Sequence, residues 1–220
     1  QSHNNRKISV SLFKREEELT GIIPLTVYKT YCFNMKNWGQ PEQLDSKNRL
    51  VATEDYAALA ECDLIIEAVF EDPDLKAQTL AAIEAHRNPQ AIIASNTSTL
   101  PISGLAKTLN EKGDFLGIHF FSPVERMMLV EIIVGKKTGD RALATALDFV
   151  RALRKTPIVV NDTRGFYANR CVLNYIQEGH LMLLEGIPAA MIENTARMAG
   201  MPVGPLSLND ETALDLGLKI

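Results

Sequence analysis

A histidine and a glutamate lie at matching positions on either side of a short polar turn. His119 is near the end of one apolar segment, Glu131 is just inside the next, and Glu125 is the midpoint between them. If the two segments pair as antiparallel strands, residues equidistant from the turn face each other across the ladder. A carboxylate beside an imidazole fixes its tautomer and makes the histidine a general base. The alternative is an ordinary surface ion pair, which the same spacing would also give.

The elements that would position this pair follow a strand–helix–strand order. Residues 64–69, 91–94 and 115–121 are short apolar runs bounded by polar residues, which is typical of strands buried on both faces of a parallel sheet. A helix is predicted over 72–88, with Asp72 as its N-cap and Pro73 in its first turn. This order predicts an α/β fold with a doubly wound, Rossmann-like sheet. The remaining elements expected here are strands over 50–53, 129–134 and 158–160, and helices over 55–60, 101–109 and 140–153.

Polar side chains follow three of these predicted strands. In a doubly wound sheet, ligands bind at the carboxyl ends of the strands, so these side chains are candidates for a common site. They are Glu67 and Glu71 after the first strand, Asn96 and Ser98 after the second, and His119 and Ser122 after the third.

The pattern becomes wholly helical after residue 161, which predicts a domain boundary there. Helices are expected over 166–185 and 188–198, with a third beginning near Asn209, and the turn that starts at Asp162 is expected to cap the first of them. Residues 1–49 form an unassigned N-terminal segment, in which 8–13 and 22–31 favour strands and 14–19 a helical turn. We therefore expect three parts, namely 1–49, an α/β part at 50–161 and a helical part at 162–220.

Composition restricts the class of function. Of the 220 residues, 46% are hydrophobic and 23% are charged, and the net charge is −4, so nothing in the composition favours a nucleic-acid partner. No apolar run is long enough to predict a membrane span, and no cluster has the spacing of metal ligands. The three cysteines, Cys32, Cys62 and Cys171, are far apart, which favours buried thiols in a reducing, cytoplasmic compartment.

Five motifs, taken in order, resemble those of the NAD-dependent 3-hydroxyacyl-CoA dehydrogenases. The resemblance runs from about Leu50 to Ile220 and is strongest to the dehydrogenase part of multifunctional fatty-acid oxidation enzymes. The motifs are residues 64–72, 94–100, 119–124 together with 129–131, 162–170 and 200–205. The resemblance implies NAD as cofactor and an acyl-CoA thioester as substrate. It also implies association as a homodimer or with other subunits of β-oxidation.

The resemblance implies a role for each matching residue. His119 matches the base that takes the hydroxyl proton of the 3-hydroxyacyl-CoA while hydride moves to the nicotinamide, and Glu131 matches its carboxylate partner. Ser98 matches a hydroxyl near the reacting oxygen, and Asn169 an amide near the base, although either side chain could instead cap a helix or a turn.

Three residues match the cofactor side of the cleft: Glu71, Lys76 and Asn96. The alternative for Lys76 is a solvated charge on an exposed helix face, and Glu67 is expected to have a structural role.

The chain departs from the family at the site for the pyrophosphate. That site needs a strand, a glycine-rich turn and a helix, but the 13 glycines of this chain include no Gly-x-Gly. We therefore expect an incomplete Rossmann-like sheet in a chain truncated at both ends. The alternative function is a catalytically impaired fragment that binds only acyl-CoA or an intact subunit. A third interpretation makes residues 1–49 the remnant of a fused upstream domain.

Overall fold

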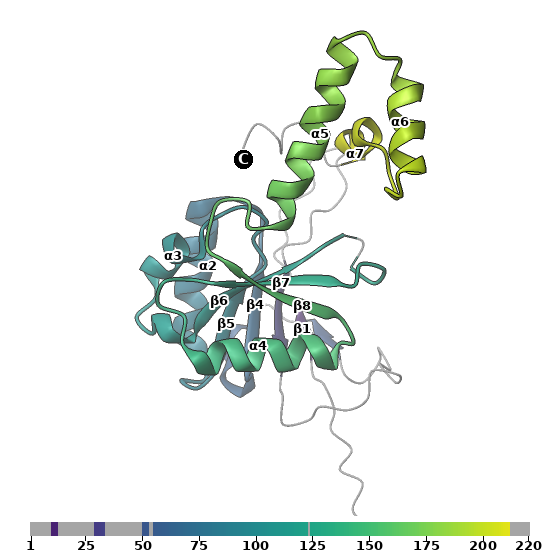
Figure 1. The fold of residues 1–220 in the computed structure, drawn as a ribbon. Helices are drawn as coiled ribbons and strands as arrows, with labels where there is room; N and C mark the ends of the chain where they lie inside the picture. Colours follow the sequence, from purple (N-terminus) through teal and green to yellow (C-terminus); the bar gives the residue numbers. More distant parts are fainter. Residues whose placement is uncertain (1–9, 13–28, 34–49, 53–54, 123, 212–220) are drawn as a thin grey trace, which may run out of the picture. The chain divides into compact units, whose positions relative to one another are not determined.

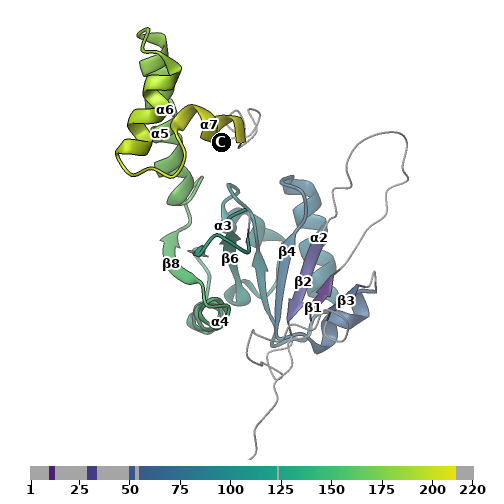
Figure 2. The same ribbon diagram turned by 90° about the vertical axis from the view of Figure 1, so that its right-hand side faces the viewer.

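The computed structural model describes residues 10–12, 29–33, 50–52, 55–122 and 124–211. The chain divides into two compact units, residues 1–162 and 163–220. The first unit contains an eight-stranded sheet with the order β3-β1-β2-β4-β5-β6-β7-β8. Figure 2 shows this order across the sheet, from β8 to β3. The strands are β1 (Val10–Leu12), β2 (Lys29–Phe33), β3 (Leu50–Ala52), β4 (Leu64–Ala68), β5 (Ile92–Ser95), β6 (Phe115–Phe120), β7 (Leu129–Val134) and β8 (Thr156–Asn161).

The helices of the first unit lie against this sheet (Figure 1). The larger ones are α2 (Pro73–His86) and α4 (Asp140–Ala152), and α2 begins as predicted, with the Asp72 carboxylate accepting hydrogen bonds from two backbone amides. The segment predicted as one helix over 101–109 forms α3 (Ile102–Leu105) and a 3₁₀ turn (Ala106–Thr108) instead. A further 3₁₀ helix spans Tyr56–Glu61 and a 3₁₀ turn spans Lys112–Asp114. This α/β, Rossmann-like architecture is the predicted fold class.

Alternation of side chains along the strands separates two buried layers. On one face Leu64 and Ile66 of β4 belong to a cluster that continues through β5, β6 and β7 and includes Phe149 and Val150 of α4. On the other face of β4, Glu67 meets Lys76 of α2. Successive side chains of a strand point to opposite faces. Because both faces of β4 are covered, this strand is apolar nearly throughout.

Strand directions decide which loops share an edge of the sheet. The β4–β5 and β5–β6 pairs are parallel, so the carboxyl ends of these three strands lie together. β7 is antiparallel to β6, which brings its first residues to the same edge. The ladder between β6 and β7 places His119 directly opposite Glu131, which confirms the predicted pairing.

The N-terminal strands form the other side of the sheet. β2 lies next to β4 and runs antiparallel to it, while β1 pairs with β2 and β3. The predicted strands over 8–13 and 50–53 are present in their described residues. The one predicted over 22–31 is described only from residue 29 and extends to Phe33. The helical turn predicted over 14–19 lies outside the described residues.

In its described residues, 163–211, the second unit contains three helices, α5 (Ala168–Leu184), α6 (Ala189–Met198) and α7 (Pro205–Glu211). Helix α7 begins four residues before the predicted Asn209, because proline is well suited to the first position of a helix. The Glu193 carboxylate of α6 accepts hydrogen bonds from the amides of Leu206 and Ser207 and from the Ser207 hydroxyl, which joins α6 to α7.

Asp162 does not cap the helix that follows it, so this prediction was wrong. Its two carboxylate oxygens accept hydrogen bonds from the amides of Ile102 and Ser103, at 2.7 and 2.8 Å, at the start of α3. The β8 strand brings Asp162 to these unsatisfied amides, which lie sixty residues earlier in the chain.

Candidate active site

The His119–Glu131 pair is buried at the edge where β4, β5 and β6 end. The imidazole Nδ1 lies 2.8 Å from Oε2 of Glu131, and the exposed fractions of the two residues are 4% and 0%. The Phe121 ring lies beside the imidazole, with 4.4 Å between ring centroids. A buried carboxylate at this distance accepts the Nδ1 proton and leaves Nε2 as the basic nitrogen. The alternative of a surface ion pair is wrong, because both side chains are inside the protein.

Asn96 connects the end of β5 to the strand that carries the histidine. Its side-chain oxygen accepts a hydrogen bond of 2.9 Å from the amide of Phe120, the residue after His119. The backbone amide of Asn96 donates a hydrogen bond to the carbonyl oxygen of Glu67 at 2.7 Å. Asn96 therefore joins the ends of all three parallel strands.

Glu71 organises the turn that contains Ser98. Its Oε1 atom accepts hydrogen bonds from the Thr97 hydroxyl at 2.6 Å and from the amides of Ser98 and Thr99, both at 3.0 Å. The Thr99 hydroxyl donates to the same oxygen. Burial alone would raise the pKa of Glu71. The Thr97 hydrogen bond, the charge of Lys76 and the Thr99 hydrogen bonds outweigh it and lower that pKa below its ordinary value.

Lys76 is fully buried, so its interpretation as a solvated charge is wrong. Its ammonium donates to Oε1 of Glu67 at 2.8 Å and to the carbonyl of Val69 at 3.1 Å, and it lies 3.4 Å from Oε2 of Glu71. These three oxygens match the three N–H donors of an ammonium. Ser95 completes the network by donating to the other oxygen of Glu67 at 2.6 Å. A contact between Lys76 and a cofactor stays a prediction.

Sequence reasoning did not select the hydroxyls of Ser95, Thr97 and Thr99. All three are buried, and all three donate to the carboxylates of Glu67 or Glu71. The signal was present, because these hydroxyls lie in a run of polar residues, 95–99, that directly follows the apolar residues 91–94.

The predicted residues that the structure brings to this edge are Glu71, Lys76, Asn96, Ser98, His119 and Glu131. Asn169 belongs to the second unit, where it is the second residue of α5. Its role near the base therefore stays a prediction.

The cysteine prediction is wrong for two of the three residues. Cys62 is buried as expected but is disulfide-bonded, and its partner lies outside the described side chains. Cys171 is a free thiol, but it is exposed on α5. Spacing along the chain cannot show which thiols the fold brings together, so the cytoplasmic location, which rested on these cysteines, stays a prediction. No helix in the described part of the chain is long and apolar enough to cross a membrane.

Comparison with known families decides the ancestry of the chain. Residues 8–163 match the NAD binding domain of 3-hydroxyacyl-CoA dehydrogenase, and residues 165–220 match the C-terminal domain of the same enzyme. The chain belongs to the 3-hydroxyacyl-CoA dehydrogenase family. The match begins at residue 8, well before Leu50, where the resemblance that we recognised begins.

Relatives and solved structures agree with this assignment. The chain is 43% identical over 171 residues to the fatty acid oxidation complex subunit alpha of Shewanella sp. strain W3-18-1, covering 78% of this chain and 24% of that protein. The corresponding Vibrio cholerae subunit is 44% identical over 165 residues, or 75% of this chain and 23% of that one. The crystal structure of (S)-3-hydroxybutyryl-CoA dehydrogenase from Ralstonia eutropha matches with a TM-score of 0.75 and 36% identity, covering 78% of this chain and 61% of that one. The chain thus spans about a quarter of the length of its curated relatives.

Proposed function

We propose that this chain carries out the NAD-dependent oxidation of an L-3-hydroxyacyl-CoA to the 3-oxoacyl-CoA, with His119 as the general base. The observation that carries the proposal is the buried hydrogen bond of 2.8 Å between His119 and Glu131. A surface pair would not need such burial, whereas a catalytic base needs a fixed tautomer and a site that excludes water.

Each residue of the edge has a part in this proposal. Glu131 holds the Nδ1 proton of His119, so that Nε2 takes the proton of the substrate hydroxyl and Glu131 stabilises the imidazolium that forms. Ser98 donates a hydrogen bond near the reacting oxygen, from a turn that Glu71 holds in place. When bound, NAD supplies the hydride acceptor.

The described residues fit only part of a dinucleotide. Asn96, Glu71 and the backbone of the turn at 96–99 offer polar groups for the nicotinamide side. The pyrophosphate normally rests on a glycine-rich turn after a strand parallel to the rest of the sheet. Here β4 has the parallel β5 on one side but the antiparallel β2 on the other, and the chain contains no Gly-x-Gly. Lys76 keeps Glu67 and Glu71 in place on this side, and its own contact with the cofactor stays a prediction.

This mismatch supports a second candidate function. In it the chain binds the acyl-CoA thioester, and associates with a second copy or with other subunits of β-oxidation, but binds NAD too weakly for turnover. The curated relatives are subunits alpha of a fatty acid oxidation complex, which supports association as part of either candidate.

Titration of the full chain with NADH, followed by nucleotide fluorescence with and without acetoacetyl-CoA, separates the two. Saturable binding with consumption of NADH supports the dehydrogenase. Binding of acetoacetyl-CoA, measured by calorimetric titration, without binding of NADH supports the second candidate. Absence of binding by either ligand contradicts both.

A matched pair of histidine variants tests the role of His119 wherever turnover is found. We expect His119→Gln to slow NADH consumption, with a loss of about 10²–10⁴-fold in kcat. His86→Gln should leave kcat unchanged, because His86 is exposed on α2 and contacts the carbonyl of Ala82 within its own helix. An equal loss in both variants would contradict the assignment.

A further inference from the structure

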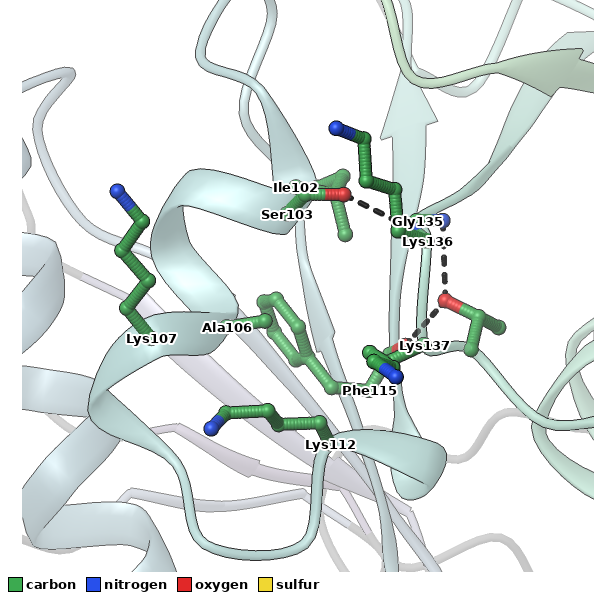
Figure 3. Close-up of a pocket in the computed structure, with 10 residues that line it drawn as sticks. Ile102, Ser103, Ala106, Lys107, Lys112, Phe115, Gly135, Lys136 and Lys137 are labelled. Atoms are coloured by element: carbon green, nitrogen blue, oxygen red, sulfur yellow. Dashed lines mark hydrogen bonds between the residues drawn. The ribbon is translucent and has the colours of Figure 1, made fainter.

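A pocket lined by lysines lies at the end of β6 opposite to His119. Its cavity of about 250 Å³ is bordered by α3, by the 3₁₀ turn before β6 and by the loop between β7 and α4. Phe115, the first residue of β6, forms part of its lining together with Ile102 and Ala106. Figure 3 shows the Phe115 ring between Lys107 on one side and Lys136 and Lys137 on the other.

All four charged residues of the lining are lysines. They are Lys107, Lys112, Lys136 and Lys137, and each is exposed. Within the described part of the chain, no ion pair joins any of them to a carboxylate. The nearby Asp114 is already occupied by Arg87 and Arg141. A protein of net charge −4 thus gathers four positive charges around one cavity.

The lining also offers a hydroxyl with an available proton. Ser103 accepts a hydrogen bond of 2.9 Å from the amide of Lys136, so its own O–H is left to donate to a ligand oxygen (Figure 3). The Thr138 hydroxyl, by contrast, donates to the carbonyl of Phe115 at 2.6 Å and accepts from the amide of Gly135, which fixes the loop. The site therefore combines a hydrogen-bonded loop with exposed positive charges.

The size and donor set of the pocket select the ligand chemistry. A cavity of about 250 Å³ is smaller than most sites for a whole drug-sized molecule. Lysine ammonium groups act as compact point charges and bind phosphate oxygens in this way. We propose that this pocket binds a diphosphate group, supplied either by free pyrophosphate or by a nucleoside diphosphate whose remaining atoms lie outside the cavity.

Calorimetric titration of the full chain with inorganic pyrophosphate and, separately, with ADP tests the proposal. We expect saturable binding at one site, weakened by salt because the lysines are exposed. The double variant K136Q/K137Q should weaken it about tenfold or more, because it removes two of the four positive charges around the cavity. Tighter binding of pyrophosphate identifies the free anion as the ligand, and tighter binding of ADP identifies the nucleotide.

The control removes the same number of charges elsewhere. R151Q/R197Q alters two arginines whose side chains are 64% and 54% exposed, and it should leave the affinity unchanged. Amide chemical shifts of isotope-labelled protein should move at Ser103 and at Gly135 to Thr138, and circular dichroism should show that all variants fold. Equal weakening in both double variants, shifts confined to other residues, or no saturable binding would overturn the proposal.

Discussion

The two ends of β6 carry charged groups under opposite conditions. At the end with His119 the charges are buried and paired, in the His119–Glu131 contact and in the network of Lys76 with Glu67 and Glu71. At the end with Phe115 four lysines are exposed and have no ion pair among the described residues. Burial makes an unpaired charge costly, whereas water supports an exposed one.

This difference predicts which property of the protein a substitution in each region should change. A charge with internal partners holds neighbouring groups in place, so its loss should change stability or the geometry of the candidate active site. An exposed charge without partners contributes little to folding and remains available to a ligand. Four substitutions test this contrast, and three of them have a control from the other region or from an exposed turn.

The largest effect is expected from Glu131→Gln. Glutamine cannot stabilise an imidazolium as a carboxylate does, so kcat for acetoacetyl-CoA reduction should fall about 10²–10⁴-fold. Initial rates of NADH consumption measure this fall in kcat. Glu125→Gln, in the exposed turn between β6 and β7, should keep the original rate. Unchanged turnover in Glu131→Gln would remove the carboxylate from the mechanism.

Lys76→Met should cause the largest loss of stability. It leaves Glu67 buried without its cation, which we expect to lower the free energy of unfolding by about 3–5 kcal/mol. Urea denaturation measures this loss, and the double variant Glu67→Gln/Lys76→Met should recover part of it. Lys112→Met, at the other end of β6, should stay within about 0.5 kcal/mol of the original protein. Equal losses of stability in Lys76→Met and Lys112→Met would show that the two ends of β6 do not differ in how their charges support the fold.

The depressed pKa of Glu71 predicts a pH dependence of stability. Because this pKa lies lower in the folded chain than its ordinary value of 4.5, the carboxylate stabilises the fold above pH 4.5. That contribution is lost as the pH falls through the folded-state pKa. Urea denaturation at a series of pH values should show the stability difference between the original protein and Glu71→Gln shrinking towards acid pH. A difference that grows towards acid pH would have the wrong sign.

The smallest effect is expected from Lys155→Met, which is intermediate between the two regions. The Lys155 ammonium is partly exposed and donates to the carbonyls of Val124 and Met127, at 2.5 and 2.7 Å, in the turn between β6 and β7. Loss of these hydrogen bonds should lower the free energy of unfolding by about 1 kcal/mol. It should also speed amide hydrogen exchange at residues 124–128. Lys136→Met should change neither quantity, and the same exchange rates in both variants would contradict a role for Lys155 in the turn.

Much of the sheet and its edge could be predicted from the sequence. Short apolar runs indicated β4, β5, β6 and β7, and polar residues after them indicated where the strands end. The pairing of His119 with Glu131 was predictable because it depends only on a hairpin and its turn, twelve residues apart. The ends of the strands were predicted less accurately, since β8 begins at Thr156 rather than at residue 158.

Other features depend on contacts that local patterns do not encode. The burial of Lys76 requires α2 to pack on the face of β4 that carries Glu67, and nothing in the helical spacing distinguishes that face from a solvated one. Asp162 caps α3 because β8 returns to it across the sheet.

By itself, the sequence determined the family, the fold class and the residues that could act as acid, base or ligand, because these follow from residue types and short spacings. Only the tertiary structure decided which charges are buried and paired, and that three separate segments bring their lysines to one cavity. The reason is that desolvation acts on positions in space, and residues distant along the chain create those positions together.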